Sequence, residues 1–181
     1  MKRCNNNSCR KRGCISAALI LIAVIMAAGC LEIEKLPPEP RVEFRSFEIS
    51  DTTDPLGNIA KAGKLTFYFE DGDGDLGIST GSSGPGDPAD LFLKLFRKTD
   101  GKMAPAPPDD PMRPANYRIP YMERLGQNKI LRGEITITIL YNFFSESDTI
   151  MYEFYIKDRA ENRSNTATTA EIPVYYNGIY K

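Results

Sequence analysis

Hydrophobic and polar residues alternate along most of this chain with a period of two residues, rather than the 3.6-residue period of a helix. The clearest run is residues 135–139, where three isoleucines alternate with two threonines. Such alternation places apolar side chains on one face of a strand and polar side chains on the other. No window of a dozen residues carries a helical stripe. We therefore predict seven β-strands, at residues 42–49, 65–69, 91–96, 119–121, 135–139, 150–156 and 172–174.

Turn-forming residues separate these strands, which is typical of an antiparallel β-sandwich. Within the first strand the phase of the alternation changes near Ser46, and this predicts a β-bulge. The connections at 77–90 and 98–116 are too long for hairpins. The second one carries five prolines, which cannot sit in a central strand. Long loops at one end of a sandwich are where binding surfaces usually lie.

The amino-terminal segment follows a different pattern. Five basic residues precede an apolar run at 15–26, which ends in Ala27-Ala28-Gly29 and is followed directly by Cys30. This is the order of an export signal. The cysteine after small residues resembles a lipobox, the signal for bacterial lipoprotein processing, which implies cleavage before Cys30 and lipidation of this cysteine, palmitate included. The alternative is an uncleaved membrane anchor, but a span needs about 20 apolar residues, and the segment 15–29 is shorter.

Cleavage before Cys30 changes the charge of the chain. The 23 basic residues fall to 18 while all 24 acidic residues remain, so the mature net charge becomes −6. An acidic chain argues against nucleic acid as a partner. Cys30 is the only cysteine left, which excludes an intramolecular disulfide. We predict a signal peptide at 1–29, an acylated N-terminus with a Pro/Glu-rich tether at 30–40, and one domain at 41–181.

Two motifs resemble those of a group of Bacteroidota lipoproteins: YFEDGDGDLG at 68–77 and YIKDRAENRSN at 155–165. Members of this group have a signal peptide and one immunoglobulin-like domain, and most are of unknown function. The resemblance covers nearly the whole mature chain. It implies an all-β fold, a seven-stranded antiparallel immunoglobulin-like β-sandwich preceded by a lipoprotein signal peptide, but no activity. It also implies an outer membrane lipoprotein, on the periplasmic face or the cell surface. Glu161 stands where the group usually has glycine.

The stretch DGDGD at 71–75 carries the most specific chemistry. Its carboxylates alternate with glycines that let a loop curl, and hard oxygen ligands of this kind suit Ca²⁺. An EF-hand is excluded, because Leu76 takes the position that requires glycine. Asp158 follows a strand that we expect beside residues 65–70, and it would supply a fourth oxygen. The alternative is a turn whose side chains cap backbone amides. The predicted Ca²⁺ ligands are Asp71, Asp73, Asp75 and Asp158.

Catalysis is not expected from this composition. The chain contains no histidine, so zinc hydrolases and most general-base schemes near pH 7 are excluded. We expect a non-enzymatic, membrane-anchored module that binds or assembles with an envelope protein or glycan. One alternative is a carbohydrate-binding or adhesion lipoprotein, and another is a glycoside hydrolase that uses carboxylates alone. The aromatic residues that such a sugar-binding platform would use are Tyr117, Tyr121, Tyr175, Tyr176 and Tyr180.

The lipobox predicts the effect of one substitution. Cys30→Ser removes the only sulfur that can take the lipid, so the precursor should stay uncleaved and unlabelled by a palmitate analogue. The measurement is the mass of the chain and its incorporation of the label. A variant that still matures to the wild-type mass and partitions into detergent would show that Cys30 is not the lipidated residue.

Overall fold

The computed structural model describes residues 35–78, 89–122 and 129–181. Residues 36–181 form one compact unit, the second of the two into which the chain divides. The predicted signal peptide and Cys30 lie outside the described residues, and so does most of the loop predicted at 77–90. Within the described ranges, no helix is long and apolar enough to cross a membrane.

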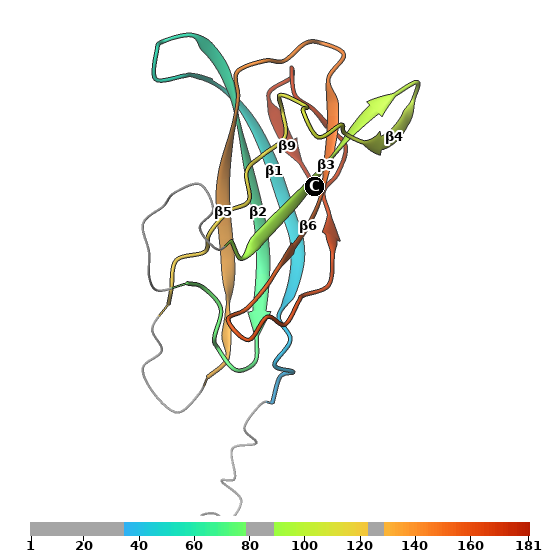
Figure 1. The fold of residues 1–181 in the computed structure, drawn as a ribbon. Helices are drawn as coiled ribbons and strands as arrows, with labels where there is room; N and C mark the ends of the chain where they lie inside the picture. Colours follow the sequence, from blue (N-terminus) through green and yellow to red (C-terminus); the bar gives the residue numbers. More distant parts are fainter. Residues whose placement is uncertain (1–34, 79–88, 123–128) are drawn as a thin grey trace, which may run out of the picture. The chain divides into compact units, whose positions relative to one another are not determined.

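The second unit is all-β, as predicted, and consists of two antiparallel sheets (Figure 1). The strands of the first sheet lie in the order β5-β2-β1-β9, and those of the second in the order β4-β3-β6-β7, with β8 paired to β6. The first sheet contains β1 (Arg41–Thr53), β2 (Ile59–Asp71), β5 (Leu131–Tyr141) and β9 (Gly178–Tyr180). The second contains β3 (Leu91–Thr99), β4 (Lys102–Pro105), β6 (Thr149–Ile156), β7 (Ala167–Thr168) and β8 (Ile172–Pro173).

The core lies between the two sheets and is rich in aromatic residues. The rings of Phe67 and Phe154 meet across the sandwich with centroids 5.1 Å apart, and those of Phe47 and Tyr152 at 5.9 Å. All four side chains are fully buried. The hydroxyl of Tyr152 also lies 3.0 Å from that of Tyr141, so the polar ends of both buried tyrosines are satisfied.

The predicted bulge in the first strand is confirmed, because the register between β1 and β2 shifts between Phe44 and Ser46. Before the bulge along β1, the side chain of Asn165 links the two sheets. The amide of Asn165, which precedes β7, accepts from the N–H of Val42 and donates to its carbonyl, both at 2.9 Å. Asn165 thus satisfies the backbone N–H and carbonyl of Val42 as a neighbouring strand would.

The strand predicted at 119–121 is wrong. Tyr117 and Pro120 form only isolated bridges, with Leu91 and Ile78. The reason is that the N–H of Ile119 donates to the carboxylate of Asp90 instead of to a neighbouring strand. The predicted count of seven also missed β4, β7 and β9, which have only four, two and three residues and are too short to carry an alternation.

The proline-rich connection at 98–116 contains one of these short strands. Pro105 lies in β4, which pairs with β3 alone. Proline is tolerated at this position because β4 is at the edge of its sheet.

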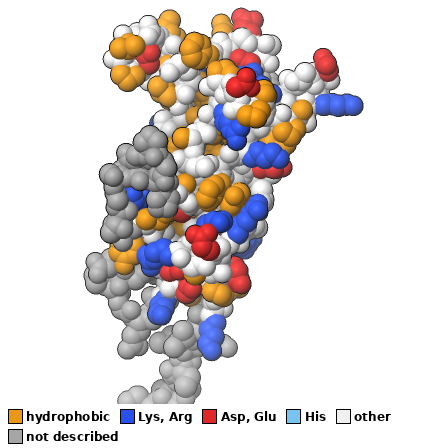
Figure 2. Space-filling model, viewed as in Figure 1, with side chains coloured by type: hydrophobic (Ala, Val, Ile, Leu, Met, Phe, Trp, Pro, Cys, Tyr) orange, Lys and Arg blue, Asp and Glu red, His pale blue; other side chains and the backbone are white. Residues whose placement is uncertain are grey.

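The two ends of the sandwich differ. We call "the base" the end formed by residues 36–40, 71–78, 129–130 and 157–163, and "the far end" the end formed by the turns at 54–58, 142–148 and 174–177. Large apolar side chains are exposed at the far end, and hydrophobic side chains gather over the β1–β2 turn in Figure 2. These far-end residues are Leu56, Ile59, Phe143, Tyr175 and Tyr176.

The packing around Gly63 leads to a prediction. A Cβ atom at this position would lie 2.6 Å from the ring of Phe47 and 2.7 Å from that of Tyr141, and both rings are buried. Gly63→Ala should therefore lower the free energy of unfolding by about 1–3 kcal/mol, the usual cost of overpacking. Urea denaturation of the mature protein measures it. Gly133→Ala is the control, because the nearest side-chain atom would lie at 3.6 Å. Equal effects of the two substitutions would contradict the packing argument.

Candidate metal centre

Three carboxylates converge where the chain leaves β2 at the base. Asp71, Asp73 and Asp75 each offer one oxygen, and these oxygens all lie within 4.8 Å of one another. Asp71 is almost completely buried, with 1% of its surface exposed. One oxygen of each residue, Oδ1, is buried and has no hydrogen-bond partner. Because a buried carboxylate oxygen without a partner is costly, this arrangement fits an oxygen-binding cation.

The other oxygens of two of these residues hold the backbone. Asp71 Oδ2 accepts from the N–H of Leu76 at 2.9 Å, which closes the loop on itself. Asp75 Oδ2 accepts from the N–H of Ala160 at 3.1 Å, which ties the loop to the connection after β6. Amide capping, the alternative predicted for this stretch, therefore accounts for these two oxygens. It leaves the three Oδ1 atoms, which are buried without a hydrogen-bond partner, unexplained.

The glycines between the aspartates bring the loop against other backbone segments. A Cβ atom at Gly72 would lie 2.1 Å from the carbonyl oxygen of Pro37. A Cβ atom at Gly74 would lie 2.0 Å from that of Lys129, and Gly74 also has a φ of 71°. A side chain at either position would force the segments apart. Because Asp and Gly alternate, the three carboxylates converge while the glycine backbone packs against the neighbouring segments.

Negative charge dominates the electrostatics of the cluster, although the charge of Arg159 lowers the pKa of Asp75. The pKa of Asp71 is raised from 3.8 to about 6, chiefly by burial; the Leu76 N–H lowers it, and the neighbouring Asp73 and Asp75 contribute to the rise. Burial also raises the pKa of Asp75, followed by the charges of Asp158 and Asp73. A bound cation would reverse these effects, because it favours the ionised form of each carboxyl.

Asp158 is not a member of this cluster. We predicted that its strand lies beside residues 65–70, but β6 belongs to the second sheet and does not pair with β2. Asp158 Oδ1 accepts from the N–H of Asn162 at 2.7 Å, and Oδ2 from the side-chain amide of the same residue at 2.8 Å. Asp158 thus builds the turn that presents Ala160 to Asp75. In this turn Glu161 adopts a φ of 67°, the left-handed backbone conformation that usually favours glycine.

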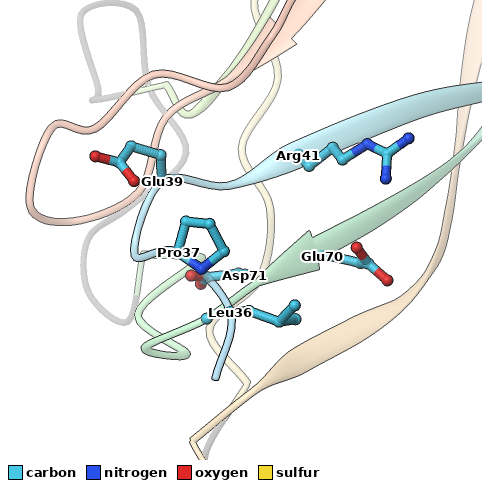
Figure 3. Close-up of a pocket in the computed structure, with 7 residues that line it drawn as sticks. Leu36, Pro37, Glu39, Arg41, Glu70 and Asp71 are labelled. Atoms are coloured by element: carbon cyan, nitrogen blue, oxygen red, sulfur yellow. The ribbon is translucent and has the colours of Figure 1, made fainter. Parts of the chain in front are cut away.

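A cleft of about 250 Å³ adjoins the cluster. Figure 3 shows Asp71 next to Pro37, behind the segment that leads into β1. The cleft is lined by Leu36, Pro37, Glu39, Arg41, Glu70, Asp71 and Gly72. We call residues 71–77, which carry the three aspartates, the metal loop. The metal loop forms one wall of this cleft, and the segment before β1 forms another.

The predicted tyrosine platform is only partly assembled. Tyr175 and Tyr176 lie together at the far end, with ring centroids 5.3 Å apart, and Tyr180 donates to the carbonyl of Tyr176. Tyr121 instead lies under the guanidinium of Arg159 at the base. Tyr117 is bonded through its backbone to Leu91, where β3 begins.

Sequence reasoning missed Lys61 at the far end. It is 6% exposed, lies 5.7 Å from the ring centroids of both Phe144 and Tyr175, and donates to Asp51 at 2.6 Å. Lys61 is in phase with the apolar positions of residues 65–69, so the alternation would have placed it on the apolar face. A lysine at such a position is the signal by which the sequence could have pointed to it.

Searches with protein-family models, against curated proteins and against solved structures found no match for this chain. The likeness to Bacteroidota lipoproteins therefore stays a prediction from the two motifs.

A second buried carboxylate gives a pH-dependent prediction. Asp90 is 3% exposed, its Oδ1 accepts from the Ile119 N–H, and its Oδ2 has no hydrogen-bond partner. Burial raises the pKa of Asp90 from 3.8 to about 6, although the Ile119 N–H and the charge of Arg118 lower it. Because the folded-state pKa is the higher one, the stability that the protonated form contributes is full below about pH 4 and is lost as the pH rises through about 6.

Asp90→Asn should remove this dependence, because an amide does not ionise and its oxygen still accepts from Ile119. The melting temperature of the variant, relative to wild type, should rise between about pH 4.5 and 7.5 by an amount equivalent to at most about 3 kcal/mol, at 1.36 kcal/mol per pKa unit. Exposed Asp109 has no such role, and Asp109→Asn is the control. A difference in melting temperature that is constant with pH would show that Asp90 has an ordinary pKa.

Proposed function

We propose that this protein is a lipid-anchored envelope lipoprotein, a non-enzymatic binding or assembly module with an immunoglobulin-like β-sandwich that holds one Ca²⁺ ion at its base. Two observations carry the Ca²⁺ assignment: Asp71, Asp73 and Asp75 bring carboxylate oxygens within 4.8 Å of one another, and one buried oxygen of each residue has no hydrogen-bond partner. The lipobox-like sequence ending at Cys30 supports the anchor. The two antiparallel sheets support an immunoglobulin-like sandwich.

Calcium suits this set of ligands better than other divalent cations. It takes six to eight oxygens in flexible geometry, so three carboxylates can be completed by carbonyl groups and water. Mg²⁺ demands a near-ideal octahedron and retains its water. Zn²⁺ prefers histidine and cysteine, and the chain has no histidine.

The burial of the cluster favours binding over catalysis. A glycosidase needs two carboxyl groups that flank a bond of the substrate. Asp71 is 1% exposed and accepts from Leu76 within its own loop, which disfavours a position beside a sugar bond. The far end favours the second candidate, a carbohydrate-binding or adhesion lipoprotein, because Phe143 and Tyr176 are 70% and 56% exposed there.

A thermal melt of the mature, acylated protein in detergent tests the Ca²⁺ assignment. We expect a single site of micromolar to millimolar affinity. At free Ca²⁺ one hundred times the dissociation constant, binding adds about 2.7 kcal/mol, so the melting temperature should rise by roughly 5–10 °C relative to EDTA.

Asp73→Asn should abolish most of this rise, because it removes one convergent carboxylate. The matched control is Asp109→Asn, which replaces an exposed carboxylate outside the cluster. An unchanged melting temperature of the wild type in CaCl₂ would leave the loop as a capped turn.

A further inference from the structure

The metal loop is a junction of four backbone segments. Gly72 packs on the carbonyl oxygens of Leu36 and Pro37, immediately before β1. Gly74 packs on the carbonyl oxygen of Lys129, immediately before β5, and Gly77 packs on that of Pro120.

The fourth segment is the turn after β6. The carbonyl of Asp75 accepts from the N–H of Arg159 at 3.4 Å, and its Oδ2 accepts from the N–H of Ala160 at 3.1 Å. The loop therefore contacts segments that are far apart in the sequence and that come from both sheets.

The residues that contact these segments alternate with the residues that face the cluster. Gly72 lies between Asp71 and Asp73, and Gly74 lies between Asp73 and Asp75. The aspartates cannot move apart without moving the glycines, because consecutive Cα atoms are held 3.8 Å apart. A backbone movement of the loop that separates the carboxylates therefore disturbs the glycine contacts as well.

A bound cation determines whether the metal loop is more stable with its carboxylates together or apart. Three carboxylate oxygens within 4.8 Å of one another repel, and no hydrogen bond offsets the charge of their buried Oδ1 atoms. Without a cation the favourable response is to separate and reach water. With a divalent cation between them, the same convergence becomes the stable arrangement.

From this geometry we infer that Ca²⁺ is a latch for the base of the sandwich: its binding holds the segment before β1 (residues 36–40) and the turn at 158–162 against the metal loop, and its loss releases both. This inference rests on the proposed Ca²⁺ site. Residues 36–40 are the last part of the tether predicted at 30–40, so the latch sets how firmly this part of the tether is held to the β-sandwich. Envelope Ca²⁺ would regulate the protein through this segment.

Hydrogen–deuterium exchange of the mature, acylated protein tests the latch, in CaCl₂ and in EDTA with MgCl₂. In the turn at 158–163, the N–H groups of Arg159 and Ala160, which donate to Asp75, should exchange about one hundredfold more slowly at free Ca²⁺ one hundred times the dissociation constant, because opening of the base then requires release of the ion. The turn between β3 and β4, at Asp100 and Gly101, is the internal reference and should not change.

Residues 36–41 contain three prolines, which have no N–H to exchange. Their release is therefore measured by the rate at which endoproteinase Lys-C cleaves after Lys35, which Ca²⁺ should slow. Direct Ca²⁺ binding is measured in parallel by calorimetry.

Two variants separate binding from latching. Asp73→Asn should lose both Ca²⁺ binding and the protection, whereas Asp109→Asn should keep both. Gly72→Ala keeps all three aspartates but places a Cβ atom against Pro37. It should retain Ca²⁺-dependent protection of 158–163 from exchange and lose the protection of Lys35 from cleavage.

The outcomes distinguish the two proposals. Calcium binding by the wild type without protection of either segment would overturn the latch and leave the site. Absence of binding would overturn both. Equal protection by Mg²⁺ alone would overturn the role of Ca²⁺.

Discussion

The stability of the base depends on how the repulsion among three carboxylates, which the fold holds close together, is offset. The oxygens of Asp71, Asp73 and Asp75 lie within 4.8 Å of one another, and one oxygen of each is buried without a partner. Burial alone raises the pKa of Asp71, and the neighbouring carboxylates add to this. These residues close the loop and tie it to the turn after β6, and Gly72 between them packs on the segment before β1. The stability of the three segments therefore depends on how the charge is neutralised.

The far end shows how the same chain neutralises buried charge when its own residues suffice. Lys61 donates to Asp51, and the guanidinium of Arg97 lies between Asp110 and Asp148. There, buried Lys61 and the two carboxylates next to Arg97 each have an oppositely charged partner within the chain. At the base, the convergent oxygens have no such partner among the described residues. This contrast within one sandwich favours a counter-charge that comes from outside the chain.

Much of the fold could be predicted from the sequence, because long strands carry their own evidence. The alternation at residues 135–139 lies inside β5, and the phase change near Ser46 marks the bulge. The short edge strands were missed because two to four residues cannot show a period. Asp71, Asp73 and Asp75 were found because they are neighbours in the sequence. The expected pairing of the strand before Asp158 with residues 65–70 was wrong, since nothing local indicates that β6 belongs to the opposite sheet.

The position of Asp158 explains why the two parts of the base differ. The turn at 158–162 is rigid by itself, whereas we propose that the order of the metal loop depends on the ion. Both of its oxygens accept from Asn162, so the turn at 158–162 is closed by its own residues and needs no cation. Glu161 can therefore be held at a positive φ, in place of the glycine expected there. The rigid turn presents the N–H of Ala160 at a fixed point, and Asp75 reaches it only when the metal loop is folded. A preformed partner of this kind lets one ion control several segments, because only the metal loop has to be ordered when the ion binds.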